Sequence, residues 1–222
     1  NANVYLVMEL MSGGDVFSRI AKQGRFAEKE AADVFVQMVS AVKYLHSKDI
    51  VHRGVMPENF MFTNKDQGSV KLCDFAYALR VSPQMRIHEA CGSPRYMSPE
   101  CINAHNTGYH KETDIWALGV TLYTLLAAYP PFRNQNHSVL YNEIISASLN
   151  NTLDDSGVND EDGIPFPATE FTNTSTSAVN LIKRCLLNIP SRRPIAEQIL
   201  THQWLTDHGH SEEPYALNTG PV

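Results

Sequence analysis

The chain of 222 residues lacks the features that mark membrane, secreted and nucleic-acid-binding proteins. Its longest apolar run, 115–129, is too short to span a bilayer and is typical of a buried helix, so no membrane span is predicted. Residues 1–3 contain no basic segment followed by an apolar one, so we predict no secretory signal there. The formal net charge of −6 argues against nucleic acid as a partner and favours basic protein partners.

Cysteine is scarce, and the cysteines that are present show no pairing pattern. The chain has 4 cysteines, and their positions 73, 91, 101 and 185 give neither close pairs nor the spacing of metal ligands. We therefore expect reduced thiols in an intracellular, cytoplasmic protein. The remaining composition is that of a globular protein, long enough for one sizeable core or one large lobe.

The most informative stretch is 50–76. Two short apolar or β-prone segments, 60–62 and 70–73, are separated by turn residues at 64–68 and predict a β-hairpin. Such a hairpin would bring Asn59 and Asp74 together, and their oxygens suit Mg²⁺, a cation that proteins hold with few ligands plus phosphate oxygens. Asn in a turn and Asp at a strand end are also common structural choices, so this pattern alone is a weak signal.

The residues around this hairpin resemble the protein-kinase motifs H-R-D-L-x-x-x-N, D-F-G and A-P-E. The chain reads HRGVMPEN, DFA and SPE at the corresponding places. The matching residues, in order, are His52, Arg53, Pro57, Glu58, Asn59, Asp74, Phe75, Pro99 and Glu100. From these motifs the chain is identified as a member of the protein kinase family, and 196–205 resembles most the calcium/calmodulin-dependent and calcium-dependent Ser/Thr kinases.

The resemblance implies an α+β fold, mostly α, like the large lobe of a kinase with short β-hairpins at the catalytic loop. We expect residues 1–9 to form the end of the small lobe and a hinge strand, 10–205 the large lobe, and 206–222 a polar tail. The glycine-rich loop and strand lysine of kinases do not occur in this sequence, so we expect the small lobe to be nearly absent. Within the lobe, the acidic stretch 150–163 is expected to be a mobile insert.

Periodic patterns locate the helices of this lobe. Apolar residues three and four apart predict a helix over 28–47, with Ala27 before it offering no capping side chain. Residues 114–126 are apolar nearly all round and predict a buried central helix. Residues 13–20 resemble the start of the lobe's first helix, and further helices are expected over 138–147, 175–187 and 195–204.

Three motif positions depart from the kinase pattern. Gly54 stands where kinases carry the Asp that accepts the substrate proton, Met56 stands where they carry a Lys, and Ala76 replaces the Gly of D-F-G. Glycine cannot accept the proton, and loss of a general base typically costs about 10²–10⁴ in rate. We therefore expect a catalytically impaired kinase-like module, a pseudokinase, with a regulatory or scaffolding role.

The resemblance also implies structural roles for charged and aromatic residues. Asp114 is expected to hold the backbone of the loop at His52 and Arg53, and His52 and Phe75 to help hold the lobe together. Glu89 lies where many relatives carry a phosphorylated Thr, so it either pairs with Arg53 or is simply solvated.

A long-range ion pair is implied near the end of the lobe. The position of Arg193 matches the family arginine that pairs with the A-P-E glutamate, which is Glu100 here. We predict that the two side chains form a largely buried pair.

The same resemblance implies a nucleotide site in an intact two-lobed form. There Asn59 and Asp74 would hold Mg²⁺ on ATP, Met61 would lie under the adenine, and Glu9 and Met11 would lie at the hinge. For the chain as printed we expect neither ATP nor Mg²⁺ to bind. No helix-loop-helix calcium motif occurs in the sequence, so calmodulin or a calcium-binding domain would act from outside this chain.

Two alternatives remain open from the sequence. The chain is an active or weakly active Ser/Thr kinase in which Glu58 replaces the missing base, or it is a truncated product without a function of its own.

Overall fold

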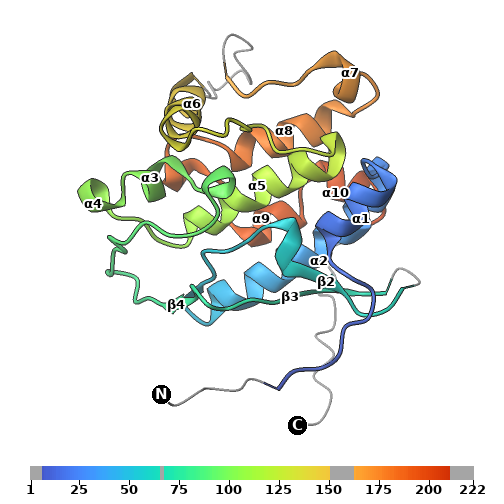
Figure 1. Cartoon of the computed structure of the whole chain (residues 1–222), viewed down its shortest axis with the longest axis horizontal. Coiled ribbons are helices and arrows are strands. Elements are labelled where there is room, and N and C mark those ends of the chain that lie inside the picture. The colour runs from blue at the N-terminus through green and yellow to red at the C-terminus, as the bar shows by residue number, and fades with distance from the viewer. Residues whose placement is uncertain (1–6, 66–67, 151–162, 211–222) are drawn as a thin grey trace.

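The computed structural model describes residues 7–65, 68–150 and 163–210. In Figure 1 the helices form the body of the molecule, and the short strands lie along one edge of it. The elements are α1 (Val16–Gln23), α2 (Glu28–Ser47), β1 (Ile50–Val51), η1 (Pro57–Asn59), β2 (Phe60–Phe62), β3 (Val70–Leu72), β4 (Leu79–Arg80), η2 (Pro94–Tyr96), α3 (Pro99–Ile102), α4 (Ala104–Thr107), α5 (Glu112–Ala127), α6 (His137–Asn150), α7 (Ala168–Phe171), α8 (Thr176–Cys185), η3 (Pro190–Arg192), α9 (Ala196–Leu200) and α10 (Gln203–Asp207).

Helix α5 is the centre of the core, as the apolar run predicts. All its residues from Thr113 to Ala127 are buried, and it packs against α2 and α8. The contact with α8 requires Gly119, because a Cβ there would lie 2.6 Å from the Cβ of Cys185. The helix thus gives a rigid base to the loops that contact it.

Helix α2 confirms the helix predicted over 28–47, and Ala27 makes no side-chain capping bond. The first turn is instead fixed by Glu28, whose carboxylate accepts hydrogen bonds from the Ser175 backbone (2.6 Å), the Ser175 hydroxyl (2.6 Å) and Trp204 Nε1 (2.7 Å). Burial raises the pKa of Glu28, but these bonds outweigh burial and leave the pKa lowered. One charged carboxylate therefore ties α2 to α8 and α10.

The predicted hairpin is present as β2 and β3, which pair antiparallel with Phe60 opposite Leu72. Strand β3 ends at Leu72, and the amide of Cys73 continues the pairing by donating to the Asn59 carbonyl at 2.8 Å. A second antiparallel pair, β1 with β4, joins the segment before His52 to the segment after Asp74. Both pairs therefore converge on the loop 52–59.

The single helix predicted over 195–204 is wrong, because α9 and α10 are separate helices. The chain leaves the helical path at Thr201 and His202, and His202 Nδ1 accepts the amide of Trp204 at 3.2 Å to begin α10. By accepting the Trp204 amide, the side chain of His202 replaces a backbone hydrogen bond that would continue the helix.

Other boundaries differ by a few residues. Helix α1 begins at Val16 rather than at residue 13, because Asp15 caps it by accepting the Ser18 amide at 2.7 Å. Helix α8 has the predicted cap, Ser175, and ends at Cys185. Residues 7–9 of the expected hinge strand adopt no strand, and residues 4–6 lie outside the described ranges.

Most of the acidic stretch 150–163 and the tail beyond residue 210 also lie outside the described residues. The division into hinge, lobe and tail stays a prediction. No helix in the described ranges is both long and apolar enough to cross a membrane.

Candidate active site

Asp114 of α5 holds the loop 52–59 through hydrogen bonds to its backbone. The Asp114 carboxylate accepts the amides of His52 and Arg53, both at 2.9 Å, and lies 2.9 Å from His46 Nε2. Burial raises the pKa of Asp114, but the bonds from His46 and from the two amides outweigh burial, so the pKa is lowered. This is the contact predicted for Asp114. The buried carboxylate stays charged because each of its oxygens accepts a hydrogen bond.

Arg53 links this loop to the segment that follows Asp74. Its backbone is left-handed, with φ 62°. Its Nε donates to the Tyr77 carbonyl at 2.6 Å, and its NH1 lies 3.3 Å from the Tyr109 hydroxyl and 3.4 Å from Glu89 Oε2. The predicted contact of Glu89 with Arg53 is therefore present, but Glu89 is 78% exposed, so the pair contributes only about 0–1 kcal/mol.

The chain accommodates Gly54 and Met56 without strain. Gly54 is not among the glycines with positive φ, and a Cβ there would meet Asn59 Nδ2 and His52 Nδ1 at 3.4 Å, an ordinary contact. Met56 is partly buried and packs against the main core. The position that would carry a cation in the family motif is thus occupied by an apolar side chain.

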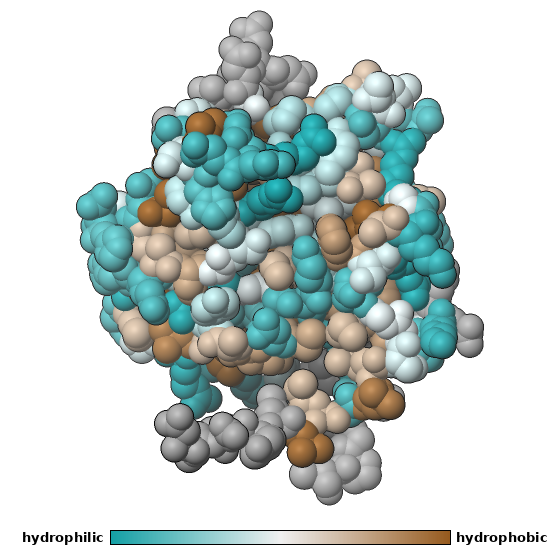
Figure 2. All heavy atoms as spheres, in the orientation of Figure 1, coloured by the Kyte–Doolittle hydropathy of each residue, from teal (hydrophilic) through white to brown (hydrophobic). Residues whose placement is uncertain are grey.

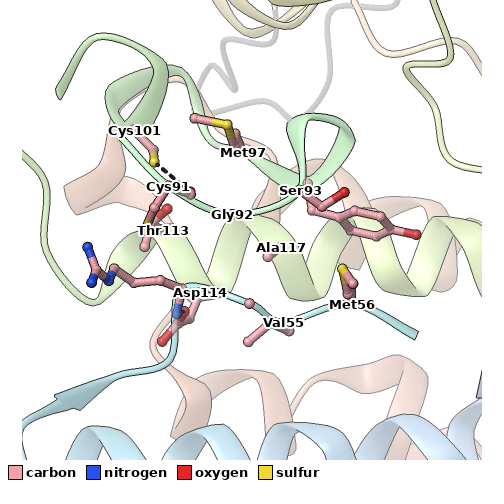
Figure 3. A pocket seen from close by; sticks show the side chains of 13 residues that line it. Val55, Met56, Cys91, Gly92, Ser93, Met97, Cys101, Thr113, Asp114 and Ala117 are labelled. Carbon is pink, nitrogen blue, oxygen red and sulfur yellow. Dashed lines mark hydrogen bonds between the residues drawn. The ribbon is translucent and has the colours of Figure 1, made fainter. Parts of the chain in front are cut away.

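A small cavity of about 20 Å³ adjoins both positions, which is enough for roughly one water molecule. Figure 3 shows this cavity between the loop with Val55 and Met56 and the segment with Cys91, Gly92 and Ser93, beside α5. Gly92 has φ 106°, and a Cβ there would lie 2.8 Å from the Arg53 carbonyl oxygen. Only glycine allows these two segments to approach so closely.

Asn59 and Asp74 retain the chemistry of magnesium ligands. Asn59 is buried, and its Nδ2 donates to the Gly54 carbonyl at 2.8 Å, which leaves the amide oxygen for another partner. Asp74 is exposed and has φ 59°, a conformation that costs about 1–3 kcal/mol and is typical of functional sites. The bond from the Cys73 amide to the Asn59 carbonyl brings the two segments side by side, as predicted.

These two residues do not form a complete metal site. Within the described ranges no group of three or more His, Cys, Asp or Glu side chains is placed to hold a metal ion. An amide oxygen and a carboxylate fit Mg²⁺ when phosphate oxygens supply further ligands.

His52 and Phe75 pack on each other beside the loop. Their rings are 4.9 Å apart at 73°, an edge-to-face contact. Burial lowers the pKa of His52, so the imidazole is neutral near pH 7. Phe75 is 44% exposed, so it packs against the loop with only part of its surface.

Glu58 lies in η1, and one of its carboxylate oxygens is buried and has no hydrogen-bond partner among the described residues. Burial raises its pKa, and the negative charge of Asp15 adds to the rise.

In the segment expected to form the hinge, Glu9 accepts two hydrogen bonds from Lys71 Nζ at 2.6 and 2.7 Å. Met61 and Met11 are partly buried. The nucleotide-binding roles expected for Glu9, Met11 and Met61 stay predictions.

The predicted ion pair between Glu100 and Arg193 is confirmed. Arg193 NH1 and NH2 donate to the two oxygens of Glu100 at 2.5 and 2.8 Å, and the side chains are 0% and 10% exposed for Arg193 and Glu100. Arg193 also donates to the carbonyls of Leu187 (2.8 Å) and Glu112 (3.0 Å). The pair thus connects α3, the start of α5 and the segment before α9.

Sequence comparison agrees with this geometry. The family model described as "Protein kinase domain" matches residues 1–205. The chain belongs to the protein kinase family. Serine/threonine-protein kinase DCLK1 of Rattus norvegicus is 37% identical over 98% of this chain, and calcium-dependent protein kinase 12 of Arabidopsis thaliana is 36% identical over 92% of it. Myosin light chain kinase A of Dictyostelium discoideum is 35% identical over 91% of the chain.

These relatives confirm the resemblance to calcium-dependent kinases. The kinase chain described here spans 49% of the rat protein, 38% of the Arabidopsis protein and 63% of the Dictyostelium protein. The activity and partners of the longer proteins therefore carry over only as proposals.

Two residues of the kinase site were missed by the sequence analysis. His46 supports Asp114, and the Tyr109 hydroxyl lies against Arg53 while donating to the Glu89 carbonyl at 2.8 Å. His46 lies 68 residues from Asp114 in the sequence, and Tyr109 lies 56 residues from Arg53. Neither residue belongs to a local pattern, so a single sequence offers no signal for them.

Proposed function

We propose that this kinase-family chain regulates or scaffolds partner proteins and transfers phosphate poorly or not at all. The observation that carries the proposal is the loop at Gly54 and Met56. Gly54 offers no group to accept the substrate proton, and Met56 packs its apolar side chain on the core instead of supplying a cation. Because such residues act as a unit, their penalties are not multiplied, yet loss of the base alone lowers the rate by about 10²–10⁴.

The retained contacts support a role that depends on the fold. The hydrogen bonds that the loop amides donate to Asp114 and the pair of Arg193 with Glu100 both maintain architecture. Because these contacts hold a defined fold together, they favour a folded binding module over a truncated product without function.

ATP with Mg²⁺ belongs to the proposal for a two-lobed form only. Kinases hold Mg²⁺ and nucleotide between both lobes, and the bound metal neutralises charge on the phosphates. In this chain Asn59 and Asp74 would hold the ion, with phosphate oxygens completing its coordination. We propose no nucleotide binding for residues 1–222 by themselves.

Regulation by calcium is proposed by analogy. The Arabidopsis relative is named a calcium-dependent protein kinase, so calmodulin or a calcium-binding domain outside this chain is a reasonable partner. An intracellular location is supported by the free thiols of Cys73, Cys91, Cys101 and Cys185.

One observation favours a second candidate, a weakly active kinase that uses Glu58 as its base. The raised pKa of Glu58 makes its carboxylate a stronger base than an ordinary glutamate. The experiment that separates the two functions is timed transfer of labelled phosphate from ATP to a basic peptide, using the natural protein with any small lobe it carries.

We expect transfer at most about 10⁻² of a normal kinase turnover of about 1–100 s⁻¹. Asp74→Ala removes a metal ligand and Glu58→Gln removes the alternative base. Transfer that Glu58→Gln and Asp74→Ala both abolish would establish the second candidate, and near-normal turnover by the parent would refute the first.

A further inference from the structure

We propose that Cys91 and Cys101 form a reversible oxidation site, in which a hydroperoxide converts the two thiols into a disulfide between the segment 88–93 and α3. Cys91 lies in an irregular part of the chain, and Cys101 lies in α3. Both are free thiols in the structure. The inference goes beyond the proposed function and does not depend on it.

The two thiols contact the same groups, although Cys101 lies 10 residues after Cys91 in the sequence. The Cys101 Sγ donates to the Cys91 carbonyl at 3.6 Å, a bond drawn as a dashed line in Figure 3. The Cys91 Sγ lies 3.7 Å from the Tyr109 hydroxyl. Burial raises the pKa of the Cys101 thiol to about 11, and hydrogen bonds to the Cys91 backbone and to the same Tyr109 hydroxyl reduce this rise. At this range a change of side-chain rotamer at Cys91 can join the two sulfurs.

Exposure gives the two cysteines different roles. Cys91 is partly exposed and follows the exposed residues 88–90, whereas Cys101 is 3% exposed. Figure 2 shows hydrophilic residues interspersed with hydrophobic ones on the face where Figure 1 labels α3 and α4, so water wets this side of the molecule. A small polar oxidant therefore reaches Cys91 first. Cys101 is held in an apolar cluster with Met97 and Tyr109, where it can react only with a partner that is already beside it.

A positive charge lies beside the thiol that is exposed. Burial lowers the pKa of Arg53, but the hydrogen bond with Tyr109 and the charge of a Cys91 thiolate outweigh burial and leave this pKa raised. Arg53, Cys91 and Cys101 also line one cavity of about 20 Å³. A neighbouring arginine is typical of reactive cysteines, because the thiolate is the form that attacks an oxidant.

The reaction needs only the two thiols and the hydroperoxide. The Cys91 sulfur attacks the O–O bond and takes one oxygen as a sulfenic acid, while the other oxygen leaves with the thiol proton as water or an alcohol. The Cys101 sulfur then attacks the sulfenic sulfur, the S–S bond forms, the S–O bond breaks, and the hydroxyl group leaves with the Cys101 proton as water. The two thiols together lose two electrons to the peroxide. A dithiol reductant returns these electrons and restores both thiols.

The disulfide would change how the segment 88–93 is held. The Tyr109 hydroxyl, which contacts Cys91, also bonds Arg53 and donates to the Glu89 carbonyl. Moving the Cys91 sulfur onto Cys101 removes it from this hydroxyl and ties the segment to α3. Oxidation would therefore alter the surroundings of Arg53 in the loop 52–59. Disulfides of this kind in intracellular proteins are usually transient and redox-sensing.

Peptide mapping by mass spectrometry tests the inference on the whole chain. The reduced protein is treated with hydrogen peroxide, the remaining thiols are blocked with N-ethylmaleimide, and the protein is digested with trypsin. Cleavage after Lys and Arg places each cysteine in a separate peptide, namely Cys73 in 72–80, Cys91 in 87–95, Cys101 in 96–111 and Cys185 in 185–192. We expect peptides 87–95 and 96–111 to be linked, with the loss of two hydrogens, at least about tenfold more often than any other pair, because positioned groups react at a high effective concentration. Dithiothreitol should remove the link.

Two variants and one condition complete the test. Cys101→Ser should abolish the linked peptide and leave Cys91 as a sulfenic acid that dimedone labels. Cys73→Ser, which removes the other partly exposed cysteine, is the matched control and should leave the linked peptide unchanged. In urea, where the fold is lost, the thiols should pair in a mixture. The inference is overturned if peroxide links another pair preferentially, if Cys91 is oxidised without joining Cys101, if neither thiol reacts, or if the folded protein gives the same mixture as the protein in urea.

Discussion

Arg193→Ala should destabilise the chain far more than the loss of any exposed charge. In the structure the guanidinium is fully buried and makes two bonds to Glu100 and three to backbone carbonyls, those of Leu187, Glu112 and Asn188. It also lies 5.0 Å from the ring centre of Trp116. In the alanine variant the Glu100 carboxylate would be almost fully buried and would have lost its charged partner.

The expected magnitude follows from this burial. Breaking a buried pair by removing one member costs about 3–5 kcal/mol, against about 0–1 kcal/mol for an exposed pair. For a chain of this size each kcal/mol lowers the melting temperature by about 2–4 °C. The variant should therefore melt roughly 6–20 °C below the parent.

Thermal unfolding followed by circular dichroism is the assay, and Arg192→Ala is the matched control because Arg192 is the exposed neighbour. We expect the control to melt within about 2 °C of the parent. Replacing both members of the pair, as Glu100→Leu with Arg193→Met, should recover most of the loss, because an apolar pair leaves no buried charge unpaired. An Arg193→Ala protein that melts like the Arg192→Ala control would refute the reasoning.

Three further outcomes are expected. Gly54→Asp with Met56→Lys should leave the melting temperature within about 2 °C of the parent, because position 54 has an ordinary φ and room for a Cβ, and the apolar stem of a Lys can keep the packing of the partly buried Met56; a much lower value would show strain. The lowered pKa of Asp114 gives stability that is present above its unfolded value of about 3.9 and is lost as the pH falls through the folded value, so Asp114→Asn should melt lower at pH 7 and lose less on acidification. An equal acid response of both proteins would contradict this. Glu89→Ala should lower the melting temperature by at most about 4 °C, since its pair with Arg53 is exposed, and a larger drop would mean that the contact matters more than its exposure indicates.

Much of the fold could be predicted because its signals are local. The buried helix at 112–127 follows from a long, mostly apolar run, and the hairpin of β2 and β3 from two short segments around a turn. The break between α9 and α10 could not be predicted, because it depends on the side chain of His202 bonding to the Trp204 amide, an alternative that periodicity does not reveal.

The site could be predicted only where residues belong to motifs. Asp114, Glu100 and Arg193 lie far from their partners in sequence, and their pairing follows from the family pattern instead of from any spacing rule. His46 and Tyr109 lack such a pattern, so their contacts appear only in three dimensions. The sequence also does not show how exposed a side chain is. Because Glu89 is exposed, its ion pair with Arg53 adds little stability.

The central claim is that the fold persists where the chemistry at Gly54 and Met56 is lost. The most direct measurement compares phosphate transfer by the natural protein, including any small lobe it carries, with transfer by its Gly54→Asp, Met56→Lys variant under the same conditions. The account predicts little transfer by the parent and a rise of about 10²-fold or more in the variant, with melting temperatures unchanged. A parent that already transfers phosphate at about 1–100 s⁻¹, and that gains nothing from the two substitutions, would contradict it.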